Sequence, residues 1–519
     1  MKKYILLLAA VLATVCALPV IHLIQSEQYE SIQKHKLLGE QFAEEGGAPP
    51  GVAVSTVFLG GFRNILANTL WIRMSRLQEK GSYFELVQLA NWILKVQPSN
   101  TAAAQYLAWN MAYNLSVIQQ DFGARWRWVQ KGLDTLMQAI ELSPNDPMLY
   151  RDLAWIYQNK LGDQLDDASL YYKFRLASEN WKIFGGRHSP DWQALTEMPS
   201  DWAQFRKKYP ALHRTVSAYR DPELLLKEFT ETGLIPETLR SRIISKEDLE
   251  HLMLSLQNMA IRAKLHIDPA MALDMEKRYG KLDWLLPDTF AIYWADVGLK
   301  KTDGRRNLHC ERVRSHGLKT MFTSGRLVFP GNEPHPDFLR LPNLELMEAA
   351  LAEYQKEDAL IEGGTIRNMG HLTFIAQAID TFYLFGRKKE AQKYFQHLRD
   401  LGYAEAHAAT LDQYVNQRLR NMIDAGTHLQ IQRLVESFVI QSAYALANGE
   451  REEAEQALST ARQIYELYQK RNRSAAEKER LRLPPFQDIT KSITSNLIRT
   501  IPALGPALKA ELQLQSGGK

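Results

Sequence analysis

Residues 70–98 read LWIRMSRLQEKGSYFELVQLANWILKVQP, and this stretch decides the fold. On either side of Gly81, apolar residues recur every three to four positions, which is typical of two amphipathic helices. Gly81 permits a tight reversal between them, because it carries no side chain. Pro98 cannot continue a helix and is expected to end the second one. The stretch therefore predicts a helical hairpin.

The same order of small and large residues recurs twice near the C-terminus. One set is Ile375, Ala378, Ile379, Phe382, Gly386, Ala391, Phe395 and Leu398. The other is Phe438, Ser442, Ala445, Gly449, Ala454, Leu458 and Ala461. The small residues stand where two helices must approach closely. A hairpin that recurs with a period of about 34 residues indicates stacked helix pairs with a shared core.

A longer variant of the hairpin follows the first one. The tripeptide Leu-Ala-Trp stands at residues 107–109 and again at 153–155. The intervening residues Gly132, Leu136, Ala139 and Pro144 repeat the pattern of the second helix of the first hairpin. The extra length falls near residues 119–127, where we expect an extended helix or a loop.

These hairpins resemble the tetratricopeptide repeat family over about two fifths of the chain. The block 61–115 is also similar to uncharacterised repeat proteins of bacterial envelopes. The resemblance implies a superhelix that binds proteins or peptides in its concave groove. It implies a groove-facing position for Trp109 and Trp155, with Tyr113 and Arg151 beside them. The alternative is that both tryptophans only fill the core.

The N-terminus predicts a membrane anchor. Lys2 and Lys3 precede an uncharged stretch, residues 4–24, which would span ~30 Å as a helix. The positive residues are expected to stay in the cytoplasm, which places the body in the periplasm of a bacterium. The alternatives are a signal cleaved near Val15-Cys16-Ala17, a lipid on Cys16, or a cytoplasmic body with inverted topology.

Sparse strand signals make the predicted fold all-α: a helical-hairpin solenoid behind an N-terminal transmembrane helix. A proline-rich loop is expected over residues 330–342. The predicted parts are an anchor at 1–25, a juxtamembrane helix and linker at 26–60, a first repeat block at 61–179, an irregular helical centre at 180–342, a second repeat block at 343–485 and a tail at 486–519.

Composition excludes several classes of protein. The 45% apolar and 24% charged residues are those of a folded chain, and a net charge of +4 over 519 residues gives no reason to expect nucleic-acid binding. With only Cys16 and Cys310, the exported body cannot form an internal disulfide or a CxxC metal site.

The basic stretch 300–326 is the remaining charged feature. Lipid headgroups or an acidic partner could be contacted by four of its arginines, Arg305, Arg306, Arg312 and Arg314. The alternative is a solvated helix face. His309, Cys310 and His316 lack a fourth ligand, so we predict no metal. We find no catalytic motif and predict no catalytic residue or cofactor, which does not exclude an enzyme.

The sequence therefore predicts a membrane-anchored scaffold or assembly factor that binds other proteins or peptides at the cell envelope. The alternative is an enzyme, or a binder of glycan or another small molecule, with a pocket among the aromatic residues 181–202 of the centre. The sequence identifies neither the partner nor the oligomeric state.

Overall fold

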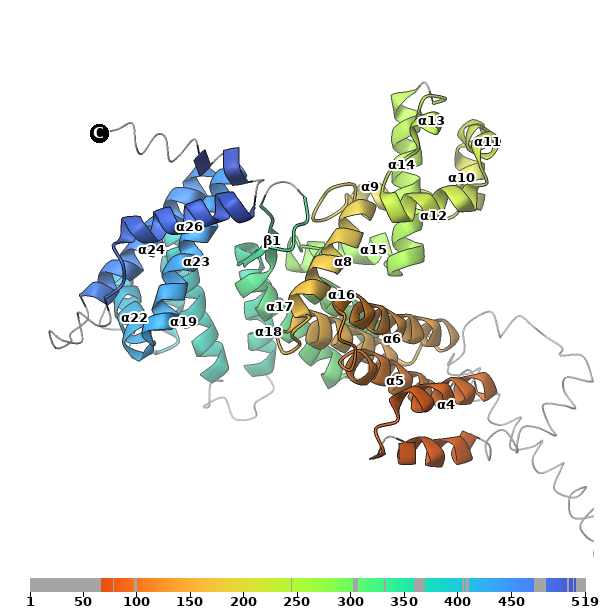
Figure 1. Ribbon diagram of the computed structural model, residues 1–519, viewed down its shortest axis with the longest axis horizontal. Coiled ribbons are helices and arrows are strands. Elements are labelled where there is room, and N and C mark those ends of the chain that lie inside the picture. The colour runs from red at the N-terminus through yellow and green to blue at the C-terminus, as the bar shows by residue number, and fades with distance from the viewer. Residues whose placement is uncertain are drawn as a thin grey trace, which may run out of the picture. The chain divides into compact units, whose positions relative to one another are not determined.

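The computed structural model describes residues 67–509, apart from residues 78, 98–99, 244, 302–306, 331–332, 359–368, 404–405, 407–409, 471–481, 502–503 and 507. The described chain is mostly helical, which confirms the all-α prediction (Figure 1). It divides into two compact units. The first contains residues 67–172 and 290–314 and the second contains 173–289 and 315–509.

The first unit is built from successive helices that reverse direction. After a helix over residues 67–77 come α4 (Tyr83–Val96), α5 (Thr101–Trp109), the π-helix η1 (Asn110–Leu115), α6 (Phe122–Leu142), α7 (Pro147–Trp155), the π-helix η2 (Ile156–Gly162) and the start of α8 (Ser169–Ile183). Figure 1 shows α4, α5 and α6 side by side, and α5 packs against both of its neighbours.

Short polar side chains set the starts of these helices. Asn100, Asp121 and Asp146 each accept a hydrogen bond from a backbone N–H in the first turn of the helix that follows. Such caps satisfy donors that have no partner inside the helix. Gly81, at the turn before α4, has a φ of +70°, a left-handed conformation that favours glycine. Pro98, the predicted end of α4, lies outside the described residues.

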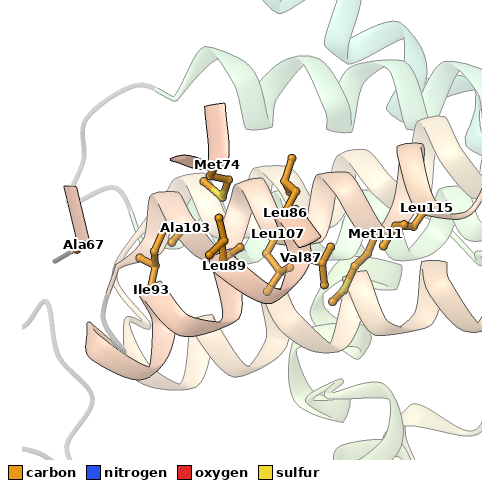
Figure 2. Close-up of a cluster of buried hydrophobic side chains, with 11 residues drawn as sticks. Ala67, Met74, Leu86, Val87, Leu89, Ile93, Ala103, Leu107, Met111 and Leu115 are labelled. Atoms are coloured by element: carbon orange, nitrogen blue, oxygen red, sulfur yellow. The ribbon is translucent and has the colours of Figure 1, made fainter. Parts of the chain in front are cut away.

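The predicted apolar faces form the core of the first hairpins (Figure 2). Met74, Leu86, Ala90 and Ile93 are fully buried, and Leu70 and Leu77 pack against them. The same cluster continues into Leu107, Met111 and Leu115 of α5 and η1. One continuous core therefore joins consecutive helix pairs, as the repeated spacing predicts.

Close approach between helices depends on glycine in this unit. A Cβ atom on Gly132 of α6 would lie 2.9 Å from the carbonyl oxygen of Ala108 on α5. Gly298 belongs to α16 (Pro287–Lys300), and a Cβ there would lie 2.9 Å from the Cβ of Tyr150 on α7. Phe290 of the same helix stacks on Tyr157 of η2, with ring centroids 5.0 Å apart. Residues 290–314, placed in the centre from the sequence, thus pack on the repeat helices.

The second unit begins with the rest of α8, from residue 173, and further helices follow. They are α9 (Trp192–Thr196), α10 (Trp202–Lys208), α11 (Pro210–Tyr219), α12 (Pro222–Thr232), α13 (Glu237–Arg240), α14 (Lys246–Ala260), the π-helix η3 (Ile261–Leu265) and α15 (Pro269–Tyr279). Prolines start α11, α12 and α15, where a missing N–H costs nothing. Gly233 ends α12 with a φ of +71°.

The rest of this unit carries the two C-terminal hairpins. Its helices are α17 from residue 315 (Leu308–Ser324 in full), η4 (Leu344–Leu346), α18 (Met347–Asp358), α19 (Met369–Leu384), α20 (Lys388–Asp400), α22 (Leu411–Ala425), α23 (His428–Ala447), α24 (Arg451–Gln469) and α26 (Phe486–Thr500). Gly386 and Gly449 form the turns of α19–α20 and α23–α24, with φ near +80°. The predicted apolar positions of both hairpins are buried, except that Leu458 is partly buried. Membership of the tetratricopeptide family stays a prediction.

A short antiparallel ribbon is the main departure from the predicted fold. Strands β1 (Arg326–Val328) and β2 (Leu339–Leu341) pair with Leu327 opposite Arg340, so the expected loop over 330–342 is in part a hairpin. Arg340 fixes it, because its guanidinium contacts the Ser324 carbonyl and lies 3.0 Å from Asp288. These contacts join residues distant in sequence, which the proline spacing alone does not reveal.

The predicted anchor at 1–25 and the linker at 26–60 lie outside the described residues. Within the described ranges, we find no helix with both the length and the apolar character required to cross a membrane.

Candidate functional site

Two π-helical segments meet in the first unit. Each follows directly after a Leu-Ala-Trp tripeptide: α5 ends at Trp109 and continues as η1, and α7 ends at Trp155 and continues as η2. π-Helical turns are rare and frequently occur at functional sites. The Tyr113 hydroxyl of η1 donates a hydrogen bond of 3.1 Å to Asn159 Oδ1 of η2. We call the surface formed by Gln105, Trp109, Tyr113, Arg151, Asp152, Trp155 and Asn159 the π-helix face.

Aromatic rings form one part of the π-helix face. Trp109 stacks on Tyr113 with ring centroids 4.1 Å apart and planes inclined by 22°. The Trp109 side chain is 47% exposed, whereas Tyr113 and Trp155 are half-buried. Burial raises the pKa of the Tyr113 hydroxyl, the Asp152 charge acts in the same direction, and a hydrogen bond with Trp155 opposes them. Three rings therefore converge here, and one of them faces solvent.

A carboxylate and a guanidinium form the other part. Arg151 Nε lies 2.9 Å from Asp152 Oδ1. Burial raises the pKa of Asp152 to about 6, although the positive charge of Arg151 and a hydrogen bond with Gln105 oppose the shift. The site thus holds a partly desolvated carboxylate whose charge is incompletely compensated.

Buried ion pairs lie next to the π-helix face. Lys160 of η2 is almost fully buried, bonds to Asp166, and lies 5.5 Å from the centre of the Tyr113 ring. Arg125 of α6 contacts Asp166 at 3.3 Å. Asp166 thus links η2 to α6, because it bonds to a cation on each. Removal of one partner would leave an uncompensated buried charge, so the link is costly to break.

Of the four residues predicted to line a groove, the structure groups Trp109, Tyr113 and Trp155, and it places Arg151 against Asp152. Whether they bind a ligand stays a prediction. Sequence reasoning missed Asp152 and Asn159. Asn159 could have been found, because it stands 46 residues after Tyr113, the same interval that separates the two tryptophans.

The predicted basic surface is only partly described. Arg305 and Arg306 lie outside the described residues, and Arg312 is exposed on α17. Arg314 does not belong to an exposed surface: its side chain is 14% exposed and lies 3.7 Å from the buried Asp296. The helical turn directs it inward, which a count of charges along the sequence cannot show.

His309, Cys310 and His316 lie on α17, within the basic stretch. Among the residues that the structure describes, no three His, Cys, Asp or Glu side chains are arranged so that they could hold a metal ion. Cys310 is fully buried, and burial raises the pKa of its thiol to about 12. It therefore stays protonated and packs against α7, where its Sγ lies 3.8 Å from the Pro147 carbonyl.

In the second unit, the aromatic residues of the centre pack on one another. Trp192 is 2% exposed and lies 4.6 Å from Trp284, measured between ring centroids. Glu276 accepts hydrogen bonds from Trp284 Nε1 at 2.8 Å and Ser189 Oγ at 3.1 Å. Trp192 thus belongs to the core, where a glycan could not stack on it.

A histidine–carboxylate pair lies beside these rings. His188 Nδ1 is 2.9 Å from Asp283 Oδ2, which also accepts the backbone N–H of Leu327. Burial lowers the pKa of His188, but the charge and hydrogen bond of Asp283 outweigh it and leave the pKa raised. The pair links the loop after α8 to β1, so we interpret it as a structural contact.

No protein-family model, curated protein or solved structure matches the chain.

Proposed function

We propose that this protein is a helical-repeat scaffold that binds a protein or peptide segment on the π-helix face. The observation that supports this most is the exposed Trp109 ring, held flat on a tyrosine that is itself fixed by Asn159. Tryptophan and tyrosine are enriched at the energetic centres of interfaces. A preformed surface loses little conformational entropy when a segment docks on it.

Polar groups around the rings would orient the bound segment. Asn159 bonds to the Tyr113 hydroxyl, on whose ring Trp109 stacks. Gln105 and Arg151 both interact with Asp152. An extended or helical segment could bury an apolar side chain against Trp109 and pair its backbone or polar groups with these side chains. This combination suits recognition of a segment and does not require chemistry on it.

The proposal places this tetratricopeptide-like scaffold at the bacterial inner membrane, with residues 4–24 as a single-pass anchor and the body in the periplasm. An anchor would confine the search for a partner to the membrane surface and so raise its effective concentration. A reporter enzyme that is active only in the periplasm, fused after Lys519, tests this location. An inactive fusion of a stable, full-length chain would contradict it.

The binding surface is tested by site-specific photo-crosslinking in native membranes. Benzoylphenylalanine replaces Trp109 or Trp155 in the full chain, and in a control it replaces the exposed Met422 of the second unit. We expect the same partner band from positions 109 and 155 and its absence from position 422. A band of equal yield at all three positions, or none at 109 and 155, contradicts the proposal.

A further inference from the structure

Two loops of the first unit, together with the first residues of the helices that follow them, expose large apolar side chains. The loops are residues 116–121, between η1 and α6, and 163–168, between η2 and α8. Leu165 is 82% exposed and Leu170 is 60% exposed, and Val117, Ile118 and Phe122 are also exposed. Single exposed apolar residues are ordinary, but a gathering of five marks an interaction surface.

Arg125 of α6 holds the two loops together. Its Nε donates to the Gln119 carbonyl of the first loop at 2.7 Å, and its Nη1 bonds to Asp166 and Asp167 of the second. The guanidinium also lies over the Phe122 ring, 5.5 Å from its centre. Only 12% of the Arg125 side chain is exposed, so it serves as an internal tie. The apolar side chains are therefore presented on a fixed support.

The outward charge of this surface is negative. The cations Arg125 and Lys160 are turned inward and paired with Asp166 and Asp167. The exposed charged residues of the two loops are carboxylates, at Asp121, Asp163 and Asp167. Local bonds position two of them, because Asp121 caps α6 and Asp163 accepts the Gln164 N–H. One exposed cation lies among them: a Cβ on Gly123 would be 3.1 Å from Asp121 Oδ2 and 3.7 Å from Arg127 Nη1. The three exposed carboxylates still outnumber this one exposed cation.

We propose that this surface, the apolar–acidic end, binds a helix or peptide of a partner protein whose apolar side chains are flanked by lysine or arginine. Such a segment would bury the leucines and place its cations beside the carboxylates. An anionic lipid surface would instead be repelled by those carboxylates. The apolar–acidic end uses residues that are distinct from the π-helix face, so the scaffold would hold two segments at once.

Fluorescence anisotropy with defined probes tests this inference on the full chain in detergent. The probes are a labelled amphipathic helix of leucine and lysine and its counterpart with glutamate in place of lysine. The variant Leu165→Ser/Leu170→Ser removes apolar contact from exposed positions, and Leu429→Ser, 53% exposed in the second unit, is its matched control. Asp121→Asn/Asp163→Asn removes charge and keeps the cap of α6. Circular dichroism verifies that each variant is folded.

We expect the lysine probe to bind and the glutamate probe not to bind. The double leucine variant should weaken binding by about tenfold or more. The double asparagine variant should weaken it severalfold and reduce its dependence on salt. Equal binding of both probes, or the same effect from Leu429→Ser, would overturn the proposal. Binding of neither peptide would also overturn it. The crosslinking at positions 109 and 155 is independent of these outcomes.

Discussion

Tyr113 and Asn159 hold equivalent positions in consecutive repeats and are hydrogen-bonded to each other. They stand 46 residues apart, each four residues beyond the tryptophan of a Leu-Ala-Trp tripeptide, and each lies in a π-helical segment. A repeat protein places equivalent residues on one face, because each repeat adds the same rotation and translation. The bond agrees with the predicted repeat, and it fixes the ring on which Trp109 stacks.

Replacement of Asn159 by alanine should destabilise the first unit by about 1–2 kcal/mol, because the half-buried Tyr113 hydroxyl loses its acceptor. The free energy of unfolding in urea, followed by tryptophan fluorescence, measures this. Tyr113→Phe removes the donor instead and should cost less, since no polar group is left unsatisfied. Gln164→Ala, in an exposed loop, is the control. If Asn159→Ala matches the control, the bond contributes nothing to stability.

The sequence predicts the helical hairpins of this protein well, because their signals are local. Apolar spacing around Gly81, Gly386 and Gly449 identifies both helices and the turn of each hairpin, and the structure buries those positions. It also identifies Trp109, Tyr113 and Trp155, whose rings lie close together. The residues that complete the site are harder to find from the sequence. Asp152 is recognised as part of it only in the folded chain, where it lies near Tyr113 and bonds to Gln105.

Contacts between distant segments explain the remaining errors. The sequence predicts Arg314 as part of a basic surface, but the fold places it beside Asp296. The β1–β2 ribbon depends on bonds from Arg340 to Ser324 and Asp288. The exposure of Leu165 cannot be predicted from the sequence either, because an apolar residue near a helix is ordinarily expected to be buried.

Substitution of Gly132 by alanine should destabilise the first unit by about 1–3 kcal/mol. A Cβ there would lie 2.9 Å from the Ala108 carbonyl oxygen, so α5 and α6 would have to separate. Gly123→Ala, in the first turn of the same helix, is the control, since its Cβ would meet only side-chain atoms at 3.1 Å or more. Chemical denaturation of both variants checks this. Equal stability of the two would show that the helices can shift without cost.

The stability of the first unit should depend on Asp152 between about pH 4 and pH 6. Burial raises the pKa of Asp152 to about 6 in the folded chain, from 3.8. Between these pH values the folded state keeps the Asp152 proton, whereas the unfolded state releases it. The contribution of Asp152 to stability is therefore fully present below pH 4 and is lost as the pH rises through 6. Asp152→Asn removes this dependence and should be relatively more stable at pH 7, by up to about 3 kcal/mol.

Urea unfolding of Asp152→Asn and of the parent chain at several pH values measures that difference. Asp163→Asn, which removes an exposed carboxylate from the same unit, is the matched control. A difference between Asp152→Asn and the parent that stays constant from pH 4 to pH 7 would contradict the assignment.

Trp109→Ala should reduce capture of the partner beyond any effect on stability. The ring is 47% exposed, so its removal costs the stacking on Tyr113, about 0.5–1.5 kcal/mol, in addition to the apolar surface that the ring buries. An aromatic residue at the centre of an interface commonly contributes at least about 2 kcal/mol to binding, which is a loss of roughly thirtyfold in affinity. Trp92 provides a matched control, because it is 51% exposed on α4 of the same unit and lies outside the π-helix face. The yield of the crosslink from position 155 is measured in both variants. A loss with Trp109→Ala alone supports recognition at this face, whereas equal loss or equal retention in the two variants contradicts it.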